Sequence, residues 1–159
     1  MAKGINITFD DKEFNKAIRN AVKKAPVAAT KALMDCVLDL AGESARRAPI
    51  ESGDLRNNCH ATINNATVYE NQLATGSPPS DIAPVGEVGY SLPYAKRQHE
   101  DLTLRHDRTD GYRILTGKNA GKTVNMVAGG EAKYLEAPFE ERKLKYITHI
   151  EEEVRKALE

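Results

Sequence analysis

Residues 26–47, PVAATKALMDCVLDLAGESARR, carry the pattern that decides the fold. Apolar residues recur there at the three- and four-residue spacing that places side chains on one helix face: Met34, Val37, Leu38, Ala41 and Ala45. Three further apolar residues widen this face: Leu33, Cys36 and Leu40. Arg46 and Arg47 favour a helix end, where cations interact well with the helix dipole, and Pro49 marks the stop. The pattern predicts a long helix that is buried against more than one neighbour.

The N-terminal part, residues 1–24, predicts a short strand followed by a separate helix. Ile5, Ile7 and Phe9 alternate with other residues as in an edge strand. The apolar residues that come next follow a helical spacing instead: Phe14, Ala17, Ile18, Ala21 and Val22. Pro26 is expected to end this helix and to begin the next one, because proline lacks the N–H that a helix interior needs.

Beyond Pro49 the spacing of apolar residues changes from helix to strand. Ala61 and Ile63, and then Val68 and Leu73, indicate two short strands around Asn64-Asn65. The remaining elements are expected as a loop at 75–81, a strand at 87–92, and a helix from about Pro138 with one face of Leu144, Ile147, Ile150, Val154 and Leu158. Residues 1–159 are therefore predicted to form one α+β domain, whose small antiparallel sheet packs against the long helix and the C-terminal helix.

An inserted arm is predicted at residues 107–128. Residues 112–116 and 122–127 resemble the two strands of a hairpin, but neither face is cleanly apolar. The arm is therefore expected to protrude from the domain, exposed and mobile, and to reach a neighbouring subunit by strand addition. A second subunit contact is expected in the loop of residues 74–85.

Charge and cysteine content limit the function classes. Lys+Arg and Asp+Glu are both 23, so no overall basic field draws the chain onto nucleic acid. A nucleic-acid-binding module stays as an alternative that would need basic residues gathered on one face. Two cysteines make no disulfide framework, and the N-terminus lacks a signal-like segment, which favours a reducing cytoplasm. The apolar stretches are too short to span a bilayer, so no membrane partner is expected.

The densest group of metal-ligand residue types contains His99, Glu100, His106 and Asp110. Because a catalytic metal needs about three converging protein ligands, these residues define an alternative function, a metal-dependent nuclease or hydrolase. The simpler interpretation is that His99 and Glu100 form hydrogen bonds in a turn, where Arg105 pairs with a carboxylate. The serines and cysteines lack the surroundings of a catalytic nucleophile. The preferred prediction is a protein that is not an enzyme and needs neither cofactor nor metal.

Three segments of the sequence together resemble a known family. The first is RAPIESGDLR at residues 47–56, directly after the long helix. The second is VGY at 88–90, followed by PYAKRQHEDL at 93–102 and ending in LRH at 104–106. The third is GGEAKYLE at 129–136, just before the last helix. In this order and spacing they resemble the minor capsid or head–tail connector proteins, neck and tail-completion components, of long-tailed bacteriophages and prophages.

The resemblance covers residues 25–159 and implies a virion structural protein at the head–tail junction. It implies a ring of identical copies that also contacts neighbouring head-connector and tail proteins, with passive contact to packaged DNA. The chain departs from the family pattern at 107–128, because family members pass quickly from the Arg-His pair to the glycine-rich return.

The matching residues are interpreted as structural. Pro49 and Gly53 would turn the chain from helix to sheet, and Tyr134 would seat the last helix. We expect the whole set to hold a shape: Pro49, Gly53, Leu55, Arg56, Tyr94, Ala95, His99, Glu100, Arg105, His106, Gly130, Tyr134 and Leu135.

Overall fold

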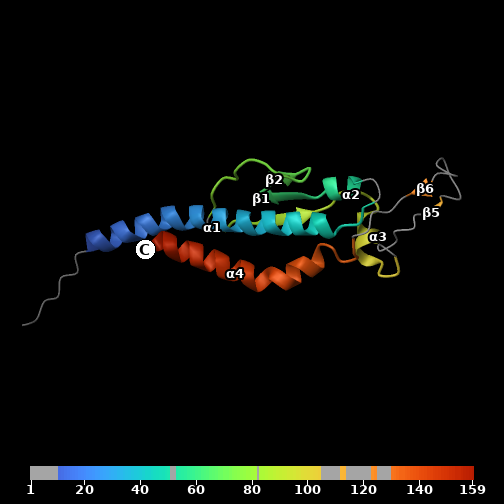
Figure 1. Cartoon of the computed structure of the whole chain (residues 1–159). Helices are drawn as coiled ribbons and strands as arrows, with labels where there is room; N and C mark the ends of the chain where they lie inside the picture. Colours follow the sequence, from blue (N-terminus) through green and yellow to red (C-terminus); the bar gives the residue numbers. More distant parts are fainter. Residues whose placement is uncertain (1–10, 51–52, 82, 105–111, 114–122, 125–129) are drawn as a thin grey trace, which may run out of the picture.

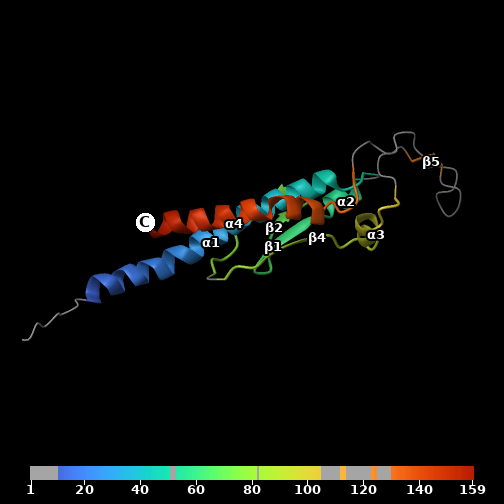
Figure 2. The same ribbon diagram turned by 90° about the horizontal axis from the view of Figure 1, so that it is seen from below.

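The long helix α1 (Asp11–Arg47) forms the axis of the molecule (Figure 1). The computed structural model describes residues 11–50, 53–81, 83–104, 112–113, 123–124 and 130–159. A small sheet lies along one side of the C-terminal half of α1, and the C-terminal helix α4 (Glu136–Leu158) lies along another side (Figures 1 and 2). The expected α+β fold, with a small antiparallel sheet packed against two helices, is confirmed.

The expected helix break at Pro26 is wrong, because α1 continues through this proline without interruption. Proline removes one backbone hydrogen bond, the one to the carbonyl of Val22, and this costs about 3 kcal/mol in a helix interior. Val22 is 59% exposed, so water has access to this turn. Residues 25, 28 and 29 are alanines, the strongest helix formers, and they continue the helix on both sides. The strand expected at residues 5–9 lies outside the described residues.

The sheet has four antiparallel strands in the order β3-β2-β1-β4. Their bounds are β1 (His60–Ile63), β2 (Ala66–Glu70), β3 (Leu73–Ala74) and β4 (Gly86–Gly89). Asn64 and Asn65 connect β1 to β2 with φ of 49° and 64°, which is the left-handed geometry of a two-residue hairpin turn. Asparagine tolerates this geometry better than most residues, so the predicted turn is confirmed. Strand β4 ends at Gly89, earlier than the expected 87–92.

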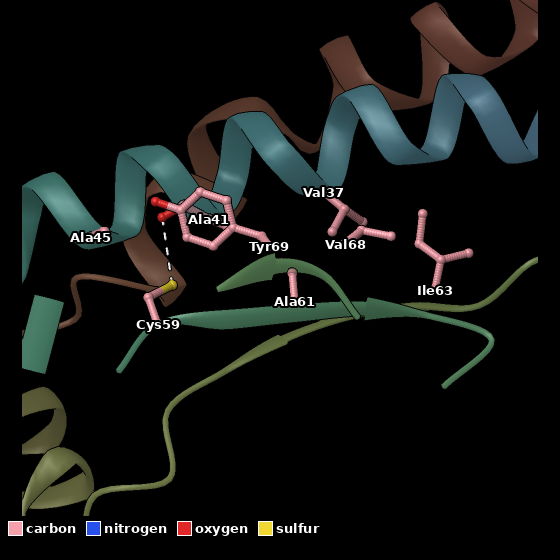
Figure 3. Close-up of a cluster of buried hydrophobic side chains, with 8 residues drawn as sticks. All are labelled: Val37, Ala41, Ala45, Cys59, Ala61, Ile63, Val68 and Tyr69. Carbon is pink, nitrogen blue, oxygen red and sulfur yellow. Dashed lines mark hydrogen bonds between the residues drawn. The ribbon is translucent and has the colours of Figure 1, made fainter. Parts of the chain in front are cut away.

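The face of the sheet that touches α1 forms the main core (Figure 3). Small residues on α1, among them Ala41 and Ala45, allow the strands to approach the helix closely. Strand β4 comes close to α1 at Gly86, where a Cβ atom would lie 2.6 Å from Val37 Cγ2. The rest of this cluster comes from strands β1 and β2 and from the residue just before β1: Cys59, Ala61, Ile63, Val68 and Tyr69. The predicted stripe of the long helix is therefore the one that packs on the sheet.

Helix α4 runs antiparallel to α1 and is held by polar as well as apolar contacts. Tyr146 is buried and donates its hydroxyl hydrogen bond to Asp39 Oδ2 at 2.8 Å, and Arg142 Nη1 donates to the same oxygen at 2.7 Å. The expected apolar face of α4 is buried only in part: Ile150 packs against the core next to Tyr146, whereas Leu144 is 73% exposed and Ile147 is 52% exposed. The pairing of Arg142 and Tyr146 with Asp39 turns a different side of the helix inward.

Shorter elements complete the fold: α2 (Asp54–Asn57), α3 (Ala95–Glu100), β5 (Tyr112–Arg113) and β6 (Thr123–Val124). Strands β5 and β6, within the predicted arm, pair antiparallel, and both views draw them beyond α3 (Figures 1 and 2). The other residues of the arm lie outside the described ones. Within the described part of the chain, no helix combines the length and the apolar character that crossing a membrane requires.

Candidate functional site

The three segments that carry the family resemblance meet around Tyr134. This side chain is 1% exposed and belongs to a buried cluster with Ala48, Leu55 and Ala95. Its hydroxyl donates a hydrogen bond to the carbonyl oxygen of Ala95 at 2.9 Å. Burial raises the pKa of Tyr134 to about 12, so the hydroxyl keeps its proton at neutral pH. Residues far apart in the sequence thus share one small core at the end of α1.

Two aromatic rings stand edge-on to Tyr134. The ring centroids of Tyr90 and Tyr134 are 5.0 Å apart, with an interplanar angle of 82°. His99 lies at the same 5.0 Å centroid distance with an angle of 87°. Ser44 and Tyr90 exchange a hydroxyl hydrogen bond of 2.8 Å, which ties this aromatic group to α1. The sequence motifs include Tyr90 but not Ser44. Ser44 reaches Tyr90 because of its position on the face of α1 that packs against the sheet.

The first and third segments touch through their backbones. A Cβ atom on Gly130 would lie 2.5 Å from Pro49 Cα, so only glycine fits this approach. The amide of Glu131 donates to the carbonyl of Arg47 at 2.9 Å. Arg56 Nε donates to the carbonyl of Ala48 at 2.9 Å, which closes the turn that follows α1.

Gly53 supplies the positive φ that this turn requires. Its φ is +89°, a conformation that residues with a side chain rarely adopt, and α2 begins at the next residue. Leu55 then points into the Tyr134 cluster and is 5% exposed. The expected structural roles of Gly53 and Leu55 therefore agree with their positions.

His99 connects α3 to the start of α4 through both ring nitrogens. Its Nε2 accepts a hydrogen bond from the Glu136 amide at 3.3 Å, and Nδ1 is 2.8 Å from Glu100 Oε1. The two bonds together require the proton to sit on Nδ1. The His99 carbonyl accepts from the Lys133 amide at 2.8 Å, so the backbone is joined at the same place.

A group of three ligand-type side chains lies at this junction. One ligand atom each of His99, Glu100 and Glu136 lies within 4.8 Å of the others, which is compact enough for a metal ion. Lys133 Nζ, however, contacts the carboxylates of both Glu100 and Glu136, the latter at 2.8 Å. Its ammonium group supplies the positive charge that a metal ion would otherwise bring.

The ion pairs of this junction shift the pKa values of Glu100 and Lys133 in the directions that favour the charged form of each side chain. The hydrogen bond from Lys133, followed by that from His99, lowers the pKa of Glu100. The hydrogen bonds to Glu100 and Glu136 raise the pKa of Lys133. Lys133 therefore balances the charge of one of the two carboxylates. His106 and Asp110, which the sequence grouped with His99 and Glu100 as metal ligands, lie outside the described residues.

The other predicted site residues have varied surroundings. Ala95 is buried, Leu135 packs against the Tyr134 cluster, and Tyr94 is 44% exposed at the start of α3. Arg105 lies outside the described residues. The loop of residues 74–85, expected at a subunit contact, is tied down by the Asp81 amide, which donates to Thr30 Oγ1 at 3.1 Å.

A groove of about 960 Å³, lined mainly by apolar side chains, runs between α1, strand β4 and α4; we call it the apolar groove. Leu33 and Leu40 of α1 line it, together with Val88 of β4 and with Phe139 and Ile147 of α4. Sequence reasoning missed this groove, although the wide apolar face of the long helix is its signal. Because β4 is an edge strand, the groove is open to solvent along the free edge of the sheet.

No family model matches the chain, and comparisons with curated proteins and with solved structures give no match either.

Proposed function

We propose that the chain is a structural subunit of the head–tail junction of a long-tailed bacteriophage, a minor capsid, neck or tail-completion protein that assembles as a ring. The observation that carries the proposal is the meeting of the three resembling segments around Tyr134. Side chains that make a binding site direct polar groups toward open space. Here the polar groups of Tyr134, His99 and Lys133 bind the protein itself.

The unburied apolar surface favours a subunit over a free-standing protein. The apolar groove and the exposed apolar side chains of α1 and α4 form surfaces that a second copy could cover. Contacts between unlike surfaces of identical copies generate a closed ring when the rotation permits it. Neighbouring head-connector and tail proteins would bind the two ends of such a ring, and packaged DNA would pass through it.

The test is the position of the protein in purified virions. Particles should be prepared from the phage or prophage that encodes the chain, and the protein labelled with an antibody for electron microscopy. We expect label at the junction of head and tail, and particles that lack the gene should carry heads and tails that do not join. Label on the capsid faces or the tail tip, or full assembly without the gene, would contradict the proposal.

The same proposal holds that the chain transforms no substrate. Purified protein should be assayed for cleavage of DNA, RNA and simple esters with Mg²⁺, Mn²⁺ or Zn²⁺ present, beside a His99→Ala variant. A matched control is His149→Ala, because His149 lies on α4 away from the Glu100 cluster and contacts Asp35 at 3.2 Å. Activity that is lost in His99→Ala and retained in His149→Ala would overturn the structural interpretation and favour the metal-dependent alternative.

A further inference from the structure

The N-terminal part of α1, residues 11–25, bears apolar side chains that this copy of the chain leaves exposed; we call it the projecting segment. Ile18 is 45% exposed and Val22 is 59% exposed. Both views draw the projecting segment extending past the C-terminal end of α4 (Figures 1 and 2). A lone helix of about 15 residues is marginally stable in water. Contact with another surface would therefore stabilise the projecting segment.

The apolar groove has the size that two turns of such a helix need. Two turns of a helix about 10 Å wide occupy roughly 850 Å³. The groove holds about 960 Å³. The apolar stripe from Ile18 through Val22 to Ala25 also extends over two turns. Leu33 and Ile147, from opposite walls, would flank a helix lying in the groove.

The charges of the two surfaces are complementary. Residues 11–24 contain five basic and two acidic residues, a net charge of +3. On the rim of the groove, Glu87 makes no ion pair among the described residues. The other acidic and basic side chains that line the groove are Glu136 and Lys143, so the lining carries two carboxylates and one ammonium group. The rim therefore carries a net negative charge opposite a basic helix.

We propose that the projecting segment of one copy lies in the apolar groove of the next copy, so that identical chains join head to tail. The inference rests on the proposed ring and names the surfaces that form it. The two surfaces differ and lie at separate places on the same chain, which is the condition for a heterologous contact that propagates around a ring.

The first experiment tests which surfaces meet. Full-length Ile18→Cys and Ile147→Cys proteins are oxidised separately and as a mixture. Both proteins also carry Cys36→Ala, because Cys36 lines the groove, and the other native cysteine, Cys59, is buried. We expect a disulfide-linked dimer in the mixture and in neither protein alone. A Leu144→Cys protein replaces Ile147→Cys as the control, because Leu144 lies on the same helix, is 73% exposed and is not part of the groove lining.

The second experiment measures association by analytical ultracentrifugation. Placing two carboxylates in an apolar contact with Ile18→Asp and Val22→Asp should raise the dissociation constant at least ~10-fold. The Leu144→Asp control should leave it unchanged. The helix content of each variant is checked by circular dichroism, since a loss of α1 would remove the contact for a trivial reason.

The outcomes separate this inference from the proposed function. Linkage of Ile18→Cys to itself, linkage of Ile147→Cys only to another virion protein, or no linkage and no effect of the Asp substitutions overturns the inference. Such a result in a protein that is found at the head–tail junction leaves the proposed function intact. Head-to-tail linkage in a protein that is absent from virions supports the contact and refutes the proposed function.

Discussion

Replacing Gly130 with alanine should destabilise the protein, because this position presses against the backbone of Pro49. An alanine Cβ would lie 2.5 Å from Pro49 Cα and 3.0 Å from its nitrogen. Carbon atoms in contact are normally about 3.5–4.0 Å apart, so one chain must move by roughly 1 Å. Pro49 is buried, its ring restricts its backbone, and the amide of Glu131 is bonded to Arg47. Neither segment can therefore yield without loss of other contacts.

Overpacking of this kind costs about 1–3 kcal/mol. In a protein of this length each kcal/mol lowers the melting temperature by roughly 2–4 °C. The assay is thermal and urea unfolding followed by far-ultraviolet circular dichroism. Gly42→Ala is the matched control, because Gly42 lies inside α1 near its C-terminal end and a Cβ there meets nothing within 4 Å. That variant should gain about 0.5–1 kcal/mol, since glycine weakens a helix interior. Equal or greater stability of Gly130→Ala, with Gly42→Ala behaving as expected, would refute the reasoning.

Three further predictions concern polar side chains in the core and at the contact between α1 and α4. Tyr134→Phe removes the hydrogen bond to the Ala95 carbonyl and should lower the free energy of unfolding by about 1 kcal/mol, measured by urea titration; an unchanged midpoint would contradict it. Burial, with Asp35 and Asp39 adding to it, raises the pKa of Cys36 to about 11, so roughly one thiol in a thousand is ionised at pH 8. Maleimide should therefore label the native protein slowly, and it should label both cysteines rapidly only after denaturation. Rapid labelling of the native protein would contradict this prediction. Burial acts to raise the pKa of Asp39, but hydrogen bonds from Arg142 and Tyr146 outweigh it and hold the pKa below its ordinary value. Its contribution to stability is therefore present at neutral pH and lost as pH falls below about 4, and Asp39→Asn should reduce that acid sensitivity in urea titrations at pH 7 and pH 3.

Local chemistry made the sheet and the core of α1 predictable from the sequence. The stripe that includes Val37 and Ala41 has a helical period long enough to identify the buried face. Asn64-Asn65 marks a two-residue turn, because few other pairs accept positive φ at both positions. Both features depend on residues close together in the chain, and both were predicted correctly.

The errors arose where a distant partner decides the outcome. The helix continues through Pro26 because a flanking run of alanines and access of water offset the missing hydrogen bond. The inward face of α4 is set by Asp39 on α1, which binds Tyr146 and Arg142 across more than 100 residues of sequence. Period analysis favoured the face that contains Leu144, since it is the more apolar one, and no local rule signals the ion pair.

In the candidate site, too, the sequence pointed to some of the residues but not to the residue that they contact in the fold. His99 and Glu100 stood out as ligand types, but their role depends on Lys133, which comes close only when the chain returns to begin α4. Lys133 has φ of +59°, so the turn itself directs the backbone back toward α3. Because the ammonium group of Lys133 binds the carboxylates of Glu100 and Glu136, this junction holds α3 to the start of α4 without a metal ion.

The position of exposed apolar residues is the step that links this fold to assembly. Among the described residues, most of the large hydrophobic side chains that are exposed lie on the two long helices: Ile18, Val22, Val27, Phe139, Leu144, Ile147 and Leu158. The sheet buries one face of α1 over its C-terminal half, and that half alone satisfies the core of a single copy. The 37-residue length of α1 exceeds what this core uses. The projecting segment extends beyond the domain and carries an apolar stripe, and the apolar groove elsewhere on the chain has a matching size. The length of α1 therefore has a physical reason if the groove of the next copy binds the projecting segment.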